Sequence, residues 1–538
     1  MRAFIQLTIS FFAASFLTGC GEEISHEKAR QNGFVFCGQA GPATFNPQLV
    51  DSGITSETLS SQLFDTLLTL DPTTYKPQPS ISTSWQVNAA GTEYEFTLKQ
   101  DVQFQTTDWF KPSRPLNADD VVFSFRRIID PNHPFHLVGN GYPWFSGIDF
   151  QNLLVSVSAV DKYTVKFTLS KPDNTFLSNI ATSHAVIHSK EYADQLQISD
   201  ELNALDSHPV GTGPFYLDDY QVNDLVRLKR HDNYWAGKAK MRQVVFDISH
   251  RGTGTLAKLL RNECDVLTSP RSSQIPTIKA HDELTLTAKP AMNISYIAVN
   301  TSHPALSDVR VRRALNHAIN RQNILDSVYY GTGSQAFSVL PQNSWAYNGD
   351  SIQVRYDRNY AIALLRDAGF SQGLTLNMLV PLEPRSYNPS PRKTAELIQA
   401  NLADIGITLN LLTDDRFSGL APGSKDKVDL YLTGWIADTG DPDNFLRPLL
   451  SCDSERAGLN ISSWCNPDFD FLLDLALEVE TPRYRINLYK QAQNILNSEF
   501  PVIPLNHGMQ FQAHDSSLVG FKMSPFNAQP FDQVERVR

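Results

Sequence analysis

Cys20 is the residue near the start of this 538-residue chain whose surroundings most clearly indicate a chemical modification. After Arg2 comes an uncharged, largely apolar run from Ala3 to Leu17, which ends in Leu17-Thr18-Gly19-Cys20. Small residues directly before a cysteine are typical of a lipobox, where the cysteine sulfur takes a diacylglycerol and the preceding bond is cleaved. A membrane-spanning helix is the alternative, but it needs about 20 apolar residues and this run has about 15. We predict a signal peptide over residues 1–19, a lipidated Cys20 and a polar tether over residues 20–32.

Four further cysteines follow Cys20, and an exported chain meets an oxidising environment. An even number suggests two disulfides, for which three pairings exist. The separation of 13 residues favours a local loop between Cys452 and Cys465, and Cys37 with Cys264 would then close a long one. A zinc site is disfavoured because no two cysteines have Cys-x-x-Cys spacing.

Arg385 and Asp438 are charged residues that each follow a predicted strand. Residues 374–380 and 428–435 have the apolar character of strands, and the first is followed by a helical pattern and a further strand. Such an α/β unit predicts a parallel sheet, and open α/β sheets bind ligands beyond the carboxyl ends of their strands. We therefore expect Arg385 and the loop 437–444 to face one crevice.

Two strands on either side of a long central block indicate how the domains connect. Residues 292–300 alternate in character, and the alternation returns at Met509, Phe511 and Ala513. A block of about 200 residues between two such strands is typical of a two-domain protein whose chain crosses between the domains twice. We predict domain I over 33–292, domain II over 293–508 and a return to domain I over 509–538.

Two helices can be predicted with their boundaries. Asn117 caps a helix that carries Asp119 and Asp120 in its first turn and stops before Pro131. Over 308–329, apolar residues recur at helical spacing, which predicts one continuous helix.

Composition and missing motifs narrow the function classes. The chain is 41% hydrophobic and 19% charged, which is typical of a packed globular protein, and its net charge of −11 argues against nucleic acid and is compatible with cationic ligands. The sequence has no Gly-x-Ser-x-Gly, His-Glu-x-x-His or P-loop motif. His184 and His188 have helical metal-ligand spacing, but such pairs are more often incidental. We expect no enzyme activity, no metal and no cofactor.

Four motifs together carry a resemblance to a known family. The chain is similar over nearly its whole mature length to bacterial extracellular solute-binding proteins of the dipeptide, oligopeptide and nickel class. The motifs are Asn117-Ala118-Asp119-Asp120-Val121-Val122-Phe123-Ser124-Phe125, Pro209-Val210-Gly211-Thr212-Gly213-Pro214-Phe215, Val309-Arg310-Val311-Arg312-Arg313-Ala314-Leu315, and the segment from Gly434-Trp435-Ile436-Ala437-Asp438 to Phe445.

The resemblance implies an α/β fold of the two-domain Venus-flytrap type, type II, with a third subdomain because domain I has two. It also implies the two disulfides. In dipeptide-binding members an aspartate at the position of Asp438 holds the ligand's α-ammonium, and an arginine at that of Arg385 holds its α-carboxylate. Strand residues Gly434, Trp435 and Ile436 would offer backbone hydrogen bonds, although Trp435 has a structural role as its alternative. Asp441 and Asp443 are interpreted as turn formers.

The implied function is the substrate-binding component of an ABC transporter. It would capture peptides, with cationic or antimicrobial peptides as a candidate subset, in the periplasm and deliver them to a permease and ATPase complex. We expect a monomer held to a membrane through its lipid. The alternatives are haem binding and a sensory or chaperone lipoprotein on the same fold.

The anchor can be tested directly. A Cys20→Ala protein has no sulfur to acylate, so it should leave the membrane fraction that holds the wild type, as judged by fractionation and immunoblotting. Persistence of Cys20→Ala with the membranes would rule out the lipid anchor.

Overall fold

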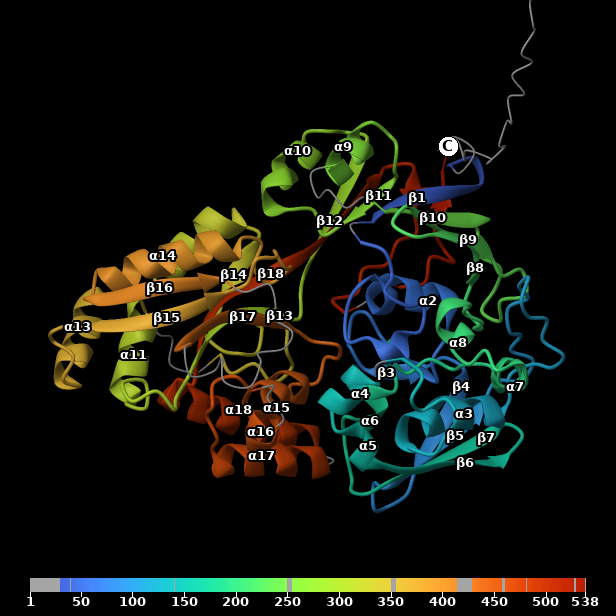
Figure 1. Ribbon diagram of the computed structural model, residues 1–538, viewed down its shortest axis with the longest axis horizontal. Helices are drawn as coiled ribbons and strands as arrows, with labels where there is room; N and C mark the ends of the chain where they lie inside the picture. The colour runs from blue at the N-terminus through green and yellow to red at the C-terminus, as the bar shows by residue number, and fades with distance from the viewer. Residues whose placement is uncertain are drawn as a thin grey trace, which may run out of the picture.

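The computed structural model describes residues 30–38, 40–139, 141–248, 254–349, 355–413, 428–456, 460–479, 481–526 and 529–537. The predicted signal peptide, Cys20 and most of the tether lie outside the described residues. Figure 1 shows two lobes of mixed helices and strands, joined by long strands that run from one to the other. The predicted α/β class is confirmed.

One large sheet extends through both lobes. Its strand order is β16 (Ile407–Thr413), β15 (Leu374–Val380), β17 (Leu430–Ile436), β13 (Asn293–Val299), β18 (Val502–Asp515), β11 (Val266–Thr268), β1 (Gly33–Gly38), β10 (Gln243–Ile248), β9 (Leu225–Arg230) and β8 (Phe215–Gln221). Strands β12 (Leu284–Pro290) and β14 (Gly333–Gln335) also pair with β18. The predicted parallel unit is present, because β15 runs parallel to β16 and β17.

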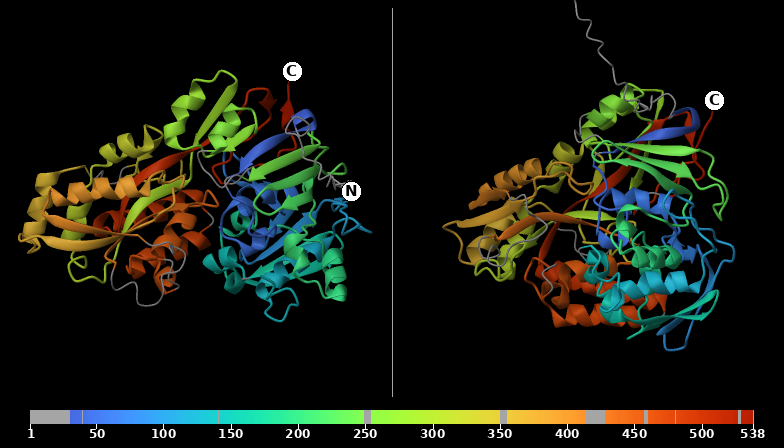
Figure 2. Two further views of the ribbon diagram at one scale, coloured as in Figure 1. Left: turned by 45° about the horizontal axis from the view of Figure 1, so that its top comes forward. Right: turned by 45° about the vertical axis from the view of Figure 1, so that its right-hand side comes forward.

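Strand β18 is the element that links the lobes. Its first part pairs with β13 and its last part with β11 and β12. Because β12 leads directly into β13, the chain crosses between lobes once there and once again along β18 (Figure 2). We call the described residues up to 292 and from 509 onward lobe I, and those between them lobe II. The domain boundaries at these points stay a prediction.

Lobe I contains a second body built on a four-stranded antiparallel sheet. This sheet has the order β4 (Ser82–Val87), β5 (Glu93–Leu98), β7 (Thr164–Leu169) and β6 (Leu154–Asp161). Helix α3 (Ala118–Ile129) packs on it through Val121 and Phe125, which are fully buried. Asn117 caps α3 and the Asp120 carboxylate accepts from the Asn117 N–H, so the predicted cap is confirmed.

The remaining elements of lobe I are short. They are η1 (Pro47–Leu49), η2 (Thr55–Leu59), α2 (Ser60–Leu63), β2 (Leu68–Leu70), β3 (Pro77–Pro79), α4 (Pro143–Gly147), α5 (Phe150–Leu153), α6 (Phe176–Asn179), α7 (Lys190–Ser199), α8 (Ala204–Ser207), α9 (Gly254–Leu260), η3 (Ser272–Gln274), α10 (Ile275–Lys279), β19 (Leu518–Val519) and β20 (Glu535–Arg536).

Helices α11 (Val309–Ala318), α13 (Arg358–Asp367) and α14 (Pro391–Ala403) form one core with the sheet of lobe II. A helical group, α15 (Asp443–Leu450), α16 (Cys452–Arg456), α17 (Pro467–Glu478) and α18 (Pro482–Glu499), lies beside α4, α5 and α6 of lobe I (Figure 1). In the part of the chain that the structure describes, no helix is long and apolar enough to cross a membrane.

The prediction of one continuous helix over 308–329 is wrong. The chain turns extended at Ile319, and α12 (Arg321–Ile324) and η4 (Leu325–Tyr329) follow as separate turns. Asn320 starts the new turn, because its side chain accepts from the Asn323 N–H. The buried Arg321 guanidinium donates to the Asn316 carbonyl at 3.1 Å and to the Pro504 carbonyl at 2.6 Å. These bonds fasten the break to β18.

Both predicted disulfides are confirmed. Cys37 of β1 is bonded to Cys264 just before β11, and Cys452 of α16 is bonded to Cys465 just before α17. The first bond therefore joins neighbouring segments of lobe I that are far apart in the sequence. The second closes a short loop in lobe II.

The two bonds should differ in their contribution to stability. Cys37 and Cys264 are 227 residues apart and Cys452 and Cys465 are 13 apart. On chain entropy alone, loops of these lengths correspond to about 5 and about 3 kcal/mol. We expect the Cys37→Ala/Cys264→Ala protein to unfold at lower urea concentration than Cys452→Ala/Cys465→Ala. The reverse order in non-reducing urea titrations would contradict the chain-entropy argument.

Candidate ligand site between the lobes

Two cavities lie where the lobes meet. A cavity of 260 Å³ is lined by lobe I residues and is bordered by Asp438 of lobe II. A larger cavity of 390 Å³ is lined from lobe I by Glu57 and Arg271 and from lobe II by Arg385. The segment η2–α2 contributes residues to both cavities, and the two predicted charged residues, Asp438 and Arg385, line different ones.

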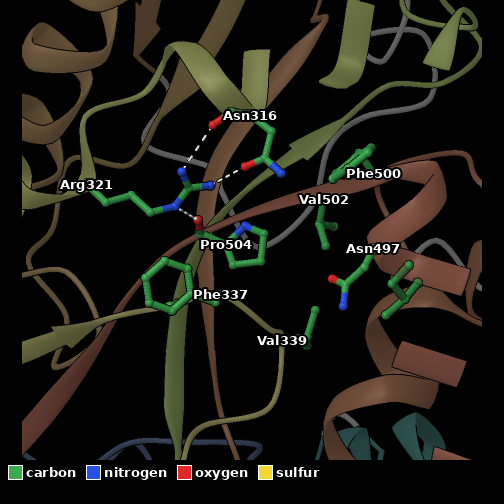
Figure 3. Close-up of a pocket in the computed structure, with 10 residues that line it drawn as sticks. Asn316, Arg321, Phe337, Val339, Asn497, Phe500, Val502 and Pro504 are labelled. Carbon is green, nitrogen blue, oxygen red and sulfur yellow. Dashed lines mark hydrogen bonds between the residues drawn. The ribbon is translucent and has the colours of Figure 1, made fainter. Parts of the chain in front are cut away.

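A third cavity, in lobe II, is too small to be the ligand site. Its volume is 10 Å³, about that of one water molecule. Figure 3 shows the Arg321 guanidinium pointing to carbonyl groups of Asn316 and Pro504 beside this cavity. Burial lowers the pKa of Arg321 to about 10. The arginine satisfies backbone carbonyls, which is a structural role.

The edge of β17 offers free backbone groups next to Asp438. The Ala437 N–H donates to the Met292 carbonyl at 2.8 Å. This bond shows which residues of β17 point their backbone groups toward β13. Backbone groups alternate in direction along a strand, so those of Gly434 and Ile436 point away from β13. On that side β15 pairs only with the beginning of β17, and no other described strand covers the edge.

Gly434 must be a glycine because another residue lies on it. A Cβ at this position would collide with the ring of Tyr387 and with the Ile294 carbonyl. Tyr387 belongs to the tight turn that follows β15, where Arg385 and Asn388 exchange backbone hydrogen bonds of 3.0 and 2.9 Å. This packing places the turn, with the exposed Arg385 side chain, against the face of β17 at Gly434.

Asp438 follows the end of β17 and is half-buried. Its carboxylate accepts a hydrogen bond of 2.9 Å from the indole N–H of Trp144, which belongs to lobe I. Removal from bulk water raises the pKa of Asp438 to about 7, against the lowering effect of the Trp144 bond. In the enclosed site without a counter-ion, the carboxylate is therefore poised to take up a proton near neutral pH.

The interpretation of Asp441 and Asp443 as turn formers is incomplete. Both are buried and ion-paired: Arg485 of α18 lies 3.0 Å from Asp441, and Arg447 of α15 lies 2.9 Å from Asp443. The Tyr489 hydroxyl also donates to Asp441 at 3.2 Å. Buried carboxylates need such partners, and the contacts of Asp441 with α18 hold the loop after Asp438 in place, whereas the pair of Asp443 lies within α15.

Lobe I contributes a second carboxylate, which is buried, to the smaller cavity. Asp65 accepts from the Trp235 indole at 2.8 Å, from the Thr212 hydroxyl at 2.9 Å and from the Tyr234 hydroxyl at 3.2 Å. Burial raises the pKa of Asp65. Lys522 also borders this cavity, but its side chain is exposed. The cavity is thus more acidic than basic.

His184, His188 and Trp435 form no metal site within the residues that the structure describes. His184 and His188 are buried outside any helix, and burial lowers the pKa of His184 to about 4. Trp435 is half-buried with its Nε1 unpaired within the described residues. Among those residues no cluster of three or more potential metal ligands is found.

The family is decided by comparison with known proteins. A family model, bacterial extracellular solute-binding proteins, family 5 Middle, matches residues 76–456. The chain belongs to this family. Among curated relatives, the peptide transport periplasmic protein SapA of Salmonella typhimurium is 44% identical over 96% of this chain and 94% of its own. Heme-binding protein A of Haemophilus influenzae is 35% identical over 98% of both chains.

A solved structure confirms the two-lobe, type II fold of family 5. The dipeptide-binding protein of Pseudoalteromonas sp. SM9913 in complex with Met-Leu matches with a TM-score of 0.85 and 37% identity. The match covers 94% of this chain and 99% of that one.

The predicted site residues are only partly brought together. Gly434, Ile436 and Asp438 lie in line along one edge, and Tyr387 places the turn of Arg385 beside it. Sequence reasoning missed Trp144 and Asp65. No local pattern could reveal them, because Trp144 and Asp438 are 294 residues apart.

The ion pairs of the Asp438 loop can be tested by their effect on stability. Arg485→Gln leaves the buried Asp441 without its cation, which should cost about 3 to 5 kcal/mol. Arg483 lies on the same helix with an exposed side chain, so Arg483→Gln should change stability by less than about 0.5 kcal/mol. Urea unfolding of both variants makes the comparison. Equal stability of Arg485→Gln and wild type would show that the pair is dispensable.

Proposed function

We propose that this chain is the substrate-binding component of an ABC transporter and that it captures peptides between its two lobes. The observation that carries the proposal is the free edge of β17, with Asp438 just beyond its end and the turn of Arg385 packed on Gly434 through Tyr387. A zwitterionic chain needs an anion for its ammonium, a cation for its carboxylate and partners for its amides.

The three kinds of partner correspond to named groups. The Asp438 carboxylate binds the α-ammonium, and the Arg385 guanidinium binds the α-carboxylate. The backbone groups of Gly434 and Ile436 pair with the peptide backbone as an added strand would, which selects for extended peptides and ignores their side chains. Trp435 between them contributes its backbone to the strand and its indole to the packing.

Charge favours cationic peptides as a subset of the ligands. Asp65 and Asp438 border the same cavity, and the net charge of the chain is −11. A basic side chain near the peptide N-terminus would be attracted by both carboxylates. A contribution to antimicrobial peptide resistance would follow from removal of such peptides.

The rest of the assignment concerns place and partners. SapA is named as a periplasmic protein of peptide transport, and we propose the periplasm for this chain too, with a lipid anchor at Cys20 and a monomeric state. The partners are a permease and ATPase complex. Peptide capture requires no bond-breaking step, and we propose that the chain is not an enzyme.

Haem is the second candidate ligand because one relative is named a heme-binding protein. Among the residues that line the two inter-lobe cavities there is no histidine to serve as an axial ligand. Absorption spectra of the purified protein with added haem separate the candidates. A sensory or chaperone role, by contrast, predicts that the protein still carries out its function in cells that lack the permease.

The two charged residues should have different effects on affinity. Asp438→Asn keeps the shape but leaves a buried ammonium unpaired, which costs about 3 to 5 kcal/mol, or roughly two to three orders of magnitude in affinity for short peptides. Arg385→Ala should weaken dipeptides more than long peptides, whose carboxylate lies beyond its reach. Calorimetric titrations with a length series measure both effects.

Two results would count against these assignments. Wild-type affinity in Asp438→Asn would contradict the ammonium partner. Equal losses at every peptide length in Arg385→Ala would contradict the carboxylate partner.

A further inference from the structure

Trp144 forms a hydrogen bond across the two lobes at the proposed ligand site. It lies on α4 of lobe I, is 5% exposed, and donates its indole N–H to Oδ2 of Asp438 at 2.9 Å. The backbone N–H of Asp438 is bonded within lobe II, to the Asn444 side chain at 3.0 Å. The carboxylate is thus held from lobe I while its backbone is held from lobe II.

Contacts within lobe I hold the Trp144 ring in place. The ring stacks on His184 with centroids 4.8 Å apart and an interplanar angle of 13°. It also meets the edge of Phe145 at 5.0 Å. His184 in turn contacts the Pro47 carbonyl through Nδ1 at 3.0 Å. Because these contacts lie within lobe I, they do not depend on where lobe II stands.

We propose that Trp144 is the lobe I half of the ammonium site: its indole N–H orients the Asp438 carboxylate toward the ligand's α-ammonium and couples that capture to closure of the lobes. The proposal rests on the proposed function. A carboxylate has about four acceptor positions, so one bond from Trp144 leaves room for an ammonium. The bond exists only while the lobes touch, so it strengthens the closed complex and leaves the first encounter unchanged.

Trp144→Phe is the variant that tests the bond. Phenylalanine keeps an aromatic ring against His184 and Phe145 but lacks the N–H donor. A hydrogen bond to a charged group corresponds to about tenfold or more in affinity. Stopped-flow or surface-plasmon measurements with a short free-amine peptide should therefore show about tenfold faster dissociation and an unchanged association rate.

Trp109→Phe is the matched control. Trp109 is another tryptophan of lobe I; it is half-buried, and its Nε1 has no hydrogen-bond partner among the described residues. The same substitution at Trp109 removes an N–H that makes no hydrogen bond to a residue of the proposed site. Peptide kinetics of Trp109→Phe should equal those of the wild type.

A double-mutant cycle with Asp438→Asn separates positioning from general packing. If Trp144 acts through Asp438, the double variant should lose little more affinity than Asp438→Asn alone. Fully additive losses, or a lower melting temperature of Trp144→Phe with unchanged dissociation, would overturn the proposal. So would wild-type kinetics of Trp144→Phe beside a strong loss in Asp438→Asn, and the peptide function would then stand. Failure of the wild type to bind any peptide would instead overturn the proposed function.

Discussion

The desolvation of the Asp438 carboxylate is the interaction on which this account depends. A carboxylate that leaves bulk water must gain either a cation or a proton. In the site without a ligand, the pKa of Asp438 is about 7, so the charged and the protonated carboxylate are about equally stable at neutral pH. An ammonium that enters with the ligand keeps the carboxylate charged. Closure of the lobes over Asp438 is therefore favourable in proportion to the positive charge that the ligand brings.

The fold supports this site through two kinds of connection. Strand β18 is shared by both lobes and pairs with β13 at one end and β12 at the other, so the lobes are linked by continuous backbone hydrogen bonds. The ion pair of Asp441 with Arg485 ties the loop after Asp438 to α18, and the pair of Asp443 with Arg447 lies within α15, where that loop ends. Asp438 is thus fixed on lobe II, and its partner Trp144 is fixed on lobe I. Their hydrogen bond therefore depends on how the two lobes stand relative to each other.

Local patterns in the sequence predicted much of this structure. The cap at Asn117, the strands that flank the central block, the parallel unit around β15 and the number of disulfides were accessible because periodicity, capping and cysteine number act over short distances or on simple counts. The pairing of the cysteines was indicated by the spacing of Cys452 and Cys465 together with the family resemblance. The break at Ile319 was not accessible, because Arg321 bonds to the distant Pro504 carbonyl and that pairing overrides helical spacing. The contact of Trp144 with Asp438 and the ion pairs of Asp441 and Asp443 also needed the folded chain.

Proton uptake on binding tests the central claim most directly. At pH 7, a dipeptide and its N-acetyl analogue are titrated calorimetrically in two buffers of different ionisation enthalpy. The enclosed carboxylate has a pKa near 7 against about 3.9 in water, so closure without an ammonium is favoured as pH falls and takes up about half a proton at pH 7. The account predicts this uptake for the N-acetyl analogue, its loss in Asp438→Asn, and almost none for the dipeptide. Equal uptake and equal affinity for both ligands would contradict it.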